Sequence, residues 1–136
     1  MCLTIFQRKF QKQNNAYRWN ILFEDKNNQK IELKKPKEAF WADPFIEIQD
    51  DLIYLFIEEM NYQTNLGEIA CIVTNKKYEI VEKRTLLANQ THFSYPQVFQ
   101  DNQQYYMMPE NSASEKLTVY KAVDFPFKWE KYIDIM

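Results

Sequence analysis

The chain has 136 residues, of which 46% are hydrophobic and 16% aromatic, so it has the length of one domain and can bury a core. Its net charge of −2 excludes the strongly basic surface that nucleic-acid binding requires, and we expect no nucleic-acid partner. No stretch is long and apolar enough to span a membrane or to form the core of a signal peptide, so we expect a cytoplasmic protein.

The cysteines, Cys2 and Cys71, are expected to be free thiols, because disulfides are rare in cytoplasmic proteins. Their spacing to the single histidine, His92, matches no pattern of metal ligands. We therefore expect neither a metal ion nor another cofactor.

The first segment of the chain, residues 1–39, is predicted to contain short strands over residues 3–10, 16–23 and 30–33. A polar run, Gln-Lys-Gln-Asn-Asn, separates the first two strands. This leader matches neither of the two later segments.

A β-hairpin is predicted within residues 40–59. Ile46 and Ile48 alternate with polar neighbours, residues 49–51 form a polar turn, and residues 52–57 return as an apolar and aromatic run. Such a run fits a strand that is buried on both faces.

The sequence repeats this hairpin at residues 92–111. Aligning Pro44 with Pro96 gives an offset of 52 (96 − 44), and the same offset aligns Glu58 with Glu110 without a gap. A repeat of about 50 residues that consists of strands is typical of propeller blades.

Each hairpin brings two side chains to the same end of its strands. A turn near residue 50 places Asp43 opposite Glu58, and a turn near Asn102 does the same for Tyr95 and Glu110.

The two prolines are expected at the first residue of a strand or on the edge of a sheet, because proline has no hydrogen to donate, and the innermost strand of a blade is such an edge. Proline also favours an extended conformation in the residue before it, here Asp43 and Tyr95.

Two further strands complete each copy of the repeat. They are predicted over residues 68–73, 78–86, 117–121 and 129–135. The fold expected is therefore all-β, a partial β-propeller of about two four-stranded antiparallel blades. The leader (1–39), the first blade (40–90) and the second blade (91–136) together form a single domain.

Several motifs carry a resemblance to known families. They are Trp-Ala-Asp-Pro-Phe-Ile at 41–46, His-Phe-Ser-Tyr-Pro-Gln-Val-Phe at 92–99, Met-Met-Pro-Glu-Asn at 107–111 and Phe-Pro-Phe-Lys-Trp at 125–129. The first resembles the opening blade of the five-bladed propellers of glycoside hydrolase families 43 and 32. Together they are similar to the N-terminal propeller domain of glucosamine inositolphosphorylceramide transferase-like proteins, over roughly residues 17–136.

The resemblance implies a role for Asp43, which falls at the position of the general base or nucleophile of the hydrolases. The chain departs from that pattern at Ser94 and Tyr95, where the second blade of the hydrolases has an aspartate. Glu110 is the candidate for the general acid, since it is expected at the same end of the fold as Asp43. Both residues also have a structural interpretation. Asp43 can cap the start of its strand, and Glu110 can form a bridge between blades.

The expected sugar contacts are Trp41, Glu58, His92, Ser94 and Tyr95. Aromatic rings suit the apolar face of a sugar, although the same rings can pack between blades. Glu58 can likewise bridge blades, and His92 can be a packing residue with its hydrogen bonds satisfied.

Two blades do not close a ring, and this predicts association through open edges and apolar faces. We expect a homo-oligomer, most simply a dimer, or a partner that supplies the missing blades; a remnant of a longer propeller and an open two-blade sandwich are the alternatives. Two functions remain. One is a non-catalytic module that binds a glycan or nucleotide-sugar-related ligand or serves assembly; the other is a glycosidase or an enzyme linked to sugar transfer.

Overall fold

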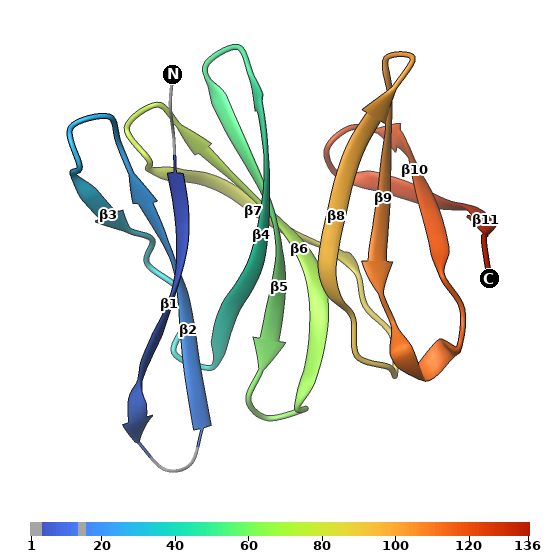
Figure 1. Ribbon diagram of the computed structural model, residues 1–136, viewed down its shortest axis with the longest axis horizontal. Helices are drawn as coiled ribbons and strands as arrows, with labels where there is room; N and C mark the ends of the chain where they lie inside the picture. Colours follow the sequence, from blue (N-terminus) through green and yellow to red (C-terminus); the bar gives the residue numbers. More distant parts are fainter. Residues whose placement is uncertain (1–3, 14–15) are drawn as a thin grey trace.

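The computed structural model describes residues 4–13 and 16–136, with side chains from Trp19 onward. Within these residues the fold is all-β, as predicted: eleven strands form three antiparallel sheets, and the helical content is a 3-10 turn at Ser112–Ser114. Figure 1 shows the sheets in a row, in the order of the chain. No helix among the described residues has the length and hydrophobicity that a membrane span needs.

The leader forms the first sheet, from β1 (Thr4–Gln13), β2 (Ala16–Glu24) and β3 (Lys30–Glu32) in that order. The three leader strands predicted from the sequence are confirmed, although residue 3 and Cys2 lie outside the described residues. Ile21 and Phe23 of β2 are completely buried in the core shared with the second sheet, so the leader is an integral layer of the fold.

The two copies of the repeat form one four-stranded sheet each. The second sheet contains β4 (Ala39–Gln49), β5 (Leu52–Asn61), β6 (Leu66–Asn75) and β7 (Ile80–Leu87). The third contains β8 (Ser94–Asp101), β9 (Gln104–Glu110), β10 (Thr118–Asp124) and β11 (Lys128–Asp134). Each strand pairs with the next along the chain.

The offset of 52 holds in the strand pairing itself. Ile46 pairs with Leu55 in the second sheet, and Val98 pairs with Met107 in the third. The two hairpin turns also correspond, because Asp50 and Asn102 both have a positive φ, of 52° and 47°. The predicted repeat is thus a structural one, and the polar turns reach this conformation without glycine.

The two prolines lie on edge strands, as expected, but inside β4 and β8 rather than at the first residue of either. β4 begins at Ala39, five residues before Pro44, and β8 begins at Ser94, two residues before Pro96. Each strand meets its proline with a bulge, since the register shifts between residues 42 and 45 and again between residues 94 and 97. At the bulge, two residues of the proline-containing strand lie opposite one residue of its partner. The proline therefore falls where no backbone N–H is needed for the pairing.

The residues before the prolines are not extended either. Asp43 has a φ of 50° and Tyr95 a φ of 47°, in the left-handed region rather than the extended one predicted. The bulge imposes this conformation and outweighs the local preference of a residue before proline. Aspartate adopts positive φ more readily than most residues, whereas a bulky tyrosine there is unusual.

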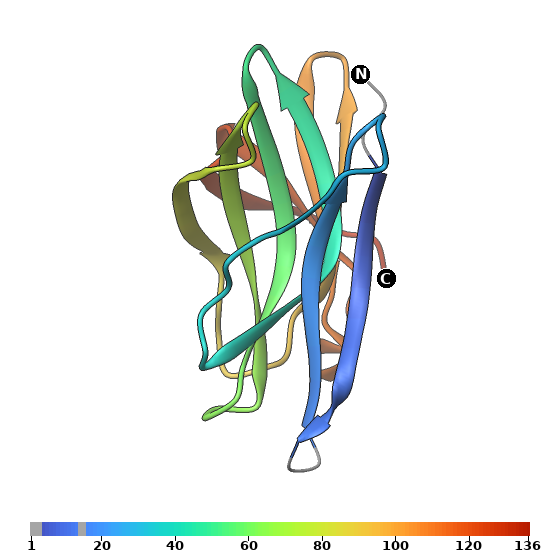
Figure 2. The same cartoon turned by 90° about the vertical axis from the view of Figure 1, so that its left-hand side faces the viewer.

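The second and third sheets pack face to face through aromatic side chains. Phe56 of β5 is completely buried, with its ring centroid 5.9 Å from that of Phe125 and 5.8 Å from that of Trp129. Phe125 precedes a cis peptide bond to Pro126, whose carbonyl oxygen accepts a hydrogen bond from the Trp129 indole at 2.7 Å. The Phe-Pro-Phe-Lys-Trp motif thus forms the turn that covers the second sheet. Figure 2 views this row of sheets from the side of the leader.

The packing of Phe56 predicts a large loss of stability for Phe56→Ala. Removing a fully buried ring between two sheets leaves a cavity, so the free energy of unfolding should fall by about 3–5 kcal/mol. The matched control is Val81→Ala on β7, whose side chain is 56% exposed, and it should change the stability by less than about 0.5 kcal/mol. Urea denaturation followed by tryptophan fluorescence measures both, and equal losses would contradict the packing described.

Candidate functional site

Two carboxyl groups meet beside the bulge in β4. Glu58 of β5 is only 6% exposed and pairs with Ala42, next to the bulge. The bulge places the carboxyl of Asp43 within hydrogen-bonding reach of the Glu58 carboxyl. The predicted approach of Asp43 to Glu58 therefore occurs.

The Glu58 carboxyl is protonated over much of the physiological pH range. Burial, followed by the hydrogen bond and the negative charge of Asp43, raises the pKa of Glu58 from 4.5 to about 8. Two carboxylates cannot hydrogen-bond to each other without a proton, and the shared proton supplies the donor.

His92 connects this pair to the third sheet. Its Nε2 lies 3.1 Å from Oε1 of Glu58, and its Nδ1 accepts a hydrogen bond from the backbone N–H of Gly67 at 3.0 Å. A nitrogen that accepts carries no hydrogen, so the proton of a neutral imidazole is on Nε2, the nitrogen that lies beside Glu58. The backbone N–H of Phe93 also donates to the Gly67 carbonyl, at 2.9 Å, and fixes the segment that leads into β8.

Gly67 is the residue of this site that sequence reasoning missed. A Cβ atom built on it would lie 2.8 Å from Cε1 of His92, 2.9 Å from Oε1 of Glu58, and closer still to the carbonyl oxygen of Phe93. Glycine is required here because there is no room for a side chain. The backbone conformation does not require it, since Gly67 does not have a positive φ. Its being the chain's single glycine was the signal available in the sequence.

The predicted sugar contacts separate into buried and accessible residues. Trp41 is 1% exposed and its indole donates to Oε2 of Glu59 at 2.6 Å, which favours the packing role over stacking on a sugar. Tyr95 is 47% exposed and lies edge-on to Phe45, with ring centroids 5.0 Å apart. Ser94 is half-buried and pairs with Glu110 across β8 and β9.

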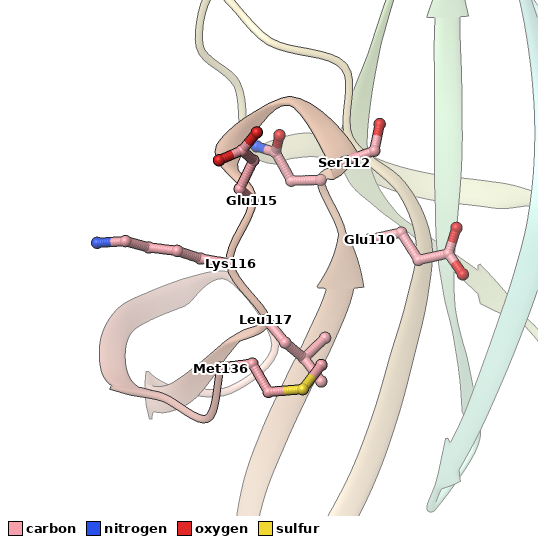
Figure 3. A pocket seen from close by; sticks show the side chains of 7 residues that line it. Glu110, Ser112, Glu115, Lys116, Leu117 and Met136 are labelled. Carbon is pink, nitrogen blue, oxygen red and sulfur yellow. The ribbon is translucent and has the colours of Figure 1, made fainter.

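Glu110 lines a hollow to which Asp43 does not contribute. It is exposed at the end of β9 and lines a hollow of about 270 Å³ together with Ser112, Lys116 and Leu117. Figure 3 shows its carboxylate pointing away from the lysine. Glu110 corresponds to Glu58 in the repeat, but Tyr95 stands where the first copy has its aspartate, so no second carboxyl pair forms there.

The described residues contain no group of three or more histidine, cysteine, aspartate or glutamate side chains placed to hold a metal ion. Burial raises the pKa of the Cys71 thiol to about 12, so this cysteine is an unreactive core residue. Asp43, with the imidazole of His92 and the exposed ring of Tyr95, thus offers hydrogen-bond partners and an aromatic surface. This combination suits polar ligands with an apolar face, such as sugars.

The chain matches the family model described as glucosamine inositolphosphorylceramide transferase 1, N-terminal, over residues 11–136. It is 37% identical over 92 residues to glucosamine inositolphosphorylceramide transferase 1 of Arabidopsis thaliana, which covers 67% of this chain and 12% of the relative. The proteins of the same name from Oryza sativa subsp. indica and subsp. japonica are each 34% identical over 91 residues, covering 66% of this chain and 12% of each relative. The matches thus span about an eighth of these relatives.

The close contacts at Gly67 predict that Gly67→Ala disturbs the site. The added methyl group must displace backbone at Phe93 as well as the His92 ring, and overpacking of this kind costs about 1–3 kcal/mol. We expect the free energy of unfolding to fall by that amount and the His92 ring resonances in an NMR spectrum to shift. Gln63→Ala, in the exposed loop before β6, is the control that should leave both unchanged. Unshifted His92 resonances in Gly67→Ala would contradict the geometry.

The raised pKa of Glu58 predicts a stability that falls with rising pH. Between pH 4.5 and about pH 8 the folded protein holds a proton that the unfolded chain has released. The contribution is fully present below pH 4.5 and is lost as the pH rises through about 8. The slope is at most about 1.4 kcal/mol per pH unit.

The variant Glu58→Gln should flatten this dependence, because its amide cannot titrate. Denaturant unfolding at pH 5, 6, 7 and 8 is the measurement. Glu115→Gln, which changes an exposed carboxyl, should retain the wild-type slope. A wild-type slope in Glu58→Gln would rule out Glu58 as its source.

Proposed function

Because the chain belongs to the family of the N-terminal region of glucosamine inositolphosphorylceramide transferase 1, we propose that it is a non-catalytic carbohydrate-binding module that acts alongside sugar transfer. The ligand is a glycan or a nucleotide-sugar-related molecule. The site is the one formed by Asp43, His92 and Tyr95, with Glu58 beneath them.

The observation that carries this proposal is the hydrogen-bonded pair of Asp43 and Glu58. Glu58 is 6% exposed, is hydrogen-bonded to Asp43 and lies 3.1 Å from Nε2 of His92, so it positions its neighbours rather than reaching a ligand. Asp43 and His92 are only partly buried and can bind hydroxyl groups of a sugar. Tyr95 follows His92 by three residues, and its exposed ring supplies an aromatic surface nearby.

The propeller interpretation belongs to the same proposal. The repeated register, the repeated bulge and the face-to-face sheets support three successive blades of a partial propeller, of which the leader sheet is the first. In such an arrangement β4 and β8 are the inner strands of their blades, and the bulges place Asp43 and Tyr95 along them.

A glycosidase or an enzyme linked to sugar transfer is the second candidate, and the raised pKa of Glu58 beside Asp43 is the observation in its favour. The spacing argues against this pair as the catalytic one. Glycosidases keep their two carboxyl groups about 5–9 Å apart so that the sugar fits between them, whereas hydrogen-bonded carboxyl groups leave no such room. Asp43 acting with Glu110 is the remaining catalytic arrangement.

The variant Asp43→Asn tests both candidates. Asparagine tolerates the positive φ at this position as well as aspartate does, so the fold should survive. We expect binding to weaken by about tenfold or more, since a hydrogen bond to a charged group contributes about 1.5–3 kcal/mol. Asp101→Asn, at the exposed end of β8, is the matched control and should bind like the wild type.

The measurement is NMR titration or calorimetry with glucosamine, UDP-N-acetylglucosamine and inositol 1-phosphate. Binding that is weaker in Asp43→Asn, without release of product, supports the binding module. Hydrolysis of nitrophenyl glycosides by the wild type that disappears in Asp43→Asn would replace it with the enzyme. Wild-type protein that binds none of the probes would overturn the proposal for this ligand class.

A further inference from the structure

A hollow of about 460 Å³ lies between the leader sheet and the second sheet. Residues 31–34, in and after β3, form one wall, and residues 77–80, in the turn between β6 and β7 and at the start of β7, form the other. Figure 1 shows β3 beside this turn. We call this space the leader hollow. Its volume falls within the range of about 300–1,000 Å³ that is usual for small-molecule sites.

An asparagine holds each wall of the leader hollow in place. Asn20, which is 4% exposed, donates through Nδ2 to Oε1 of Glu32 at 2.6 Å. In the other wall, Oδ1 of Asn75 accepts the backbone N–H groups of Lys77 and Glu79 at 2.9 and 3.1 Å. The amide of Asn75 also donates to Oε2 of Glu79 at 2.7 Å. Walls that are ordered before a ligand arrives lower the entropic cost of binding it.

Tyr78 supplies an aromatic ring to the leader hollow. This ring lies over the completely buried ring of Phe23, with centroids 4.8 Å apart and planes at 32°. One face of the Tyr78 ring is therefore covered by the core, and the rest of this half-buried side chain is available to the hollow. Ile31 and Ile80 add apolar surface, and Ile80 is 39% exposed. The apolar face of a pyranose ring packs well on such a surface.

The charged groups of the leader hollow complement hydroxyl groups. Lys34 and Lys77 are exposed and form no ion pair with the residues that the structure describes, while Glu32 and Glu79 each accept a hydrogen bond from an asparagine amide. The two positive and two negative charges cancel, so the hollow favours no ion of either sign. Ammonium groups donate hydrogen bonds and carboxylates accept them, and a sugar hydroxyl can do both.

We propose that the leader hollow binds a neutral carbohydrate. A pyranose ring packs against Tyr78, and its hydroxyl groups accept hydrogen bonds from Lys34 and Lys77. A phosphorylated ligand fits less well, because it would bring negative charge beside two carboxylates. This is a second sugar site, beyond the one proposed at Asp43, and the two have no residue in common.

The test is an NMR titration of the whole chain with two neutral trisaccharides, cellotriose and maltotriose, into the millimolar range. Backbone resonances of residues 31–34 and 77–80 should shift together with at least one of them and give a single dissociation constant. Inorganic phosphate is the comparison probe, and it should leave these resonances in place.

The double variant K34A/K77A should weaken trisaccharide binding by about tenfold or more, because hydrogen bonds to charged groups are among the stronger ones. Both side chains are exposed and unpaired, so the fold should survive. The matched control is K26A/K37A, which removes two exposed lysines that do not line the leader hollow. It should bind like the wild type.

A second pair of variants tests the aromatic ring. Tyr78→Leu keeps an apolar contact with Phe23 but removes the ring, and it should weaken binding by about tenfold. Tyr78→Phe keeps the ring and should retain most of the affinity. Urea denaturation shows whether each variant is folded, and equal losses of affinity in the two would contradict stacking on the ring.

Four outcomes would overturn the proposal. The trisaccharides may shift neither wall, or phosphate alone may shift both, which would make the leader hollow an anion site. K34A/K77A and K26A/K37A may weaken binding equally. Finally, the wall shifts may disappear in Asp43→Asn, which would place the sugar at the other site. Wall shifts that persist in Asp43→Asn support the leader hollow whether or not the site at Asp43 binds, so the two proposals can fail separately.

Discussion

A proline inside a β-strand leaves its neighbour without a hydrogen-bond donor, and this constraint shapes both copies of the repeat. Pro44 and Pro96 each lie two residues after the last regular pair of their strand, and each is accommodated by a bulge at the same place. The bulge forces a positive φ on the residue before the proline. In the first copy that residue is an aspartate, and the turn of the backbone directs its carboxyl to Glu58. The candidate site thus follows from a backbone constraint.

The same site also joins two sheets. His92 belongs to the connection between β7 and β8, yet its ring lies between the Gly67 N–H of β6 and the Glu58 carboxyl of β5. These bonds are directional, whereas the aromatic contacts of Phe56 are not, so the aromatic core supplies cohesion and the histidine fixes the relative position. A ligand that exchanged hydrogen bonds with His92 or Asp43 would act on a group that both sheets share.

The strands could be predicted from the sequence because alternation and polar turns are local signals; residues 49–51 formed the expected turn. The bulges could not be predicted. The local preference of a residue before proline favours an extended conformation, and only the pairing of the two strands overrides it. The proximity of Asp43 and Glu58 followed from counting residues to the turn. The contacts of His92 with Gly67, 25 residues apart along the chain, depend on how two sheets pack. The repeat likewise aligned Glu110 with Glu58 but could not show the hollow that Glu110 lines.

The differences between the two copies are more informative about function than their agreement. The same position of the repeat holds Asp43 in one copy and Tyr95 in the other. In the first copy the bulge presents a carboxyl that raises the pKa of Glu58, and in the second it presents an exposed aromatic ring. Tyr95 is the less favourable residue at this φ, because a bulky side chain is unusual there; its ring packs edge-on against Phe45. The bulge sets this φ in both copies, and at Tyr95 it leaves the aromatic ring 47% exposed, where the proposed ligand can reach it.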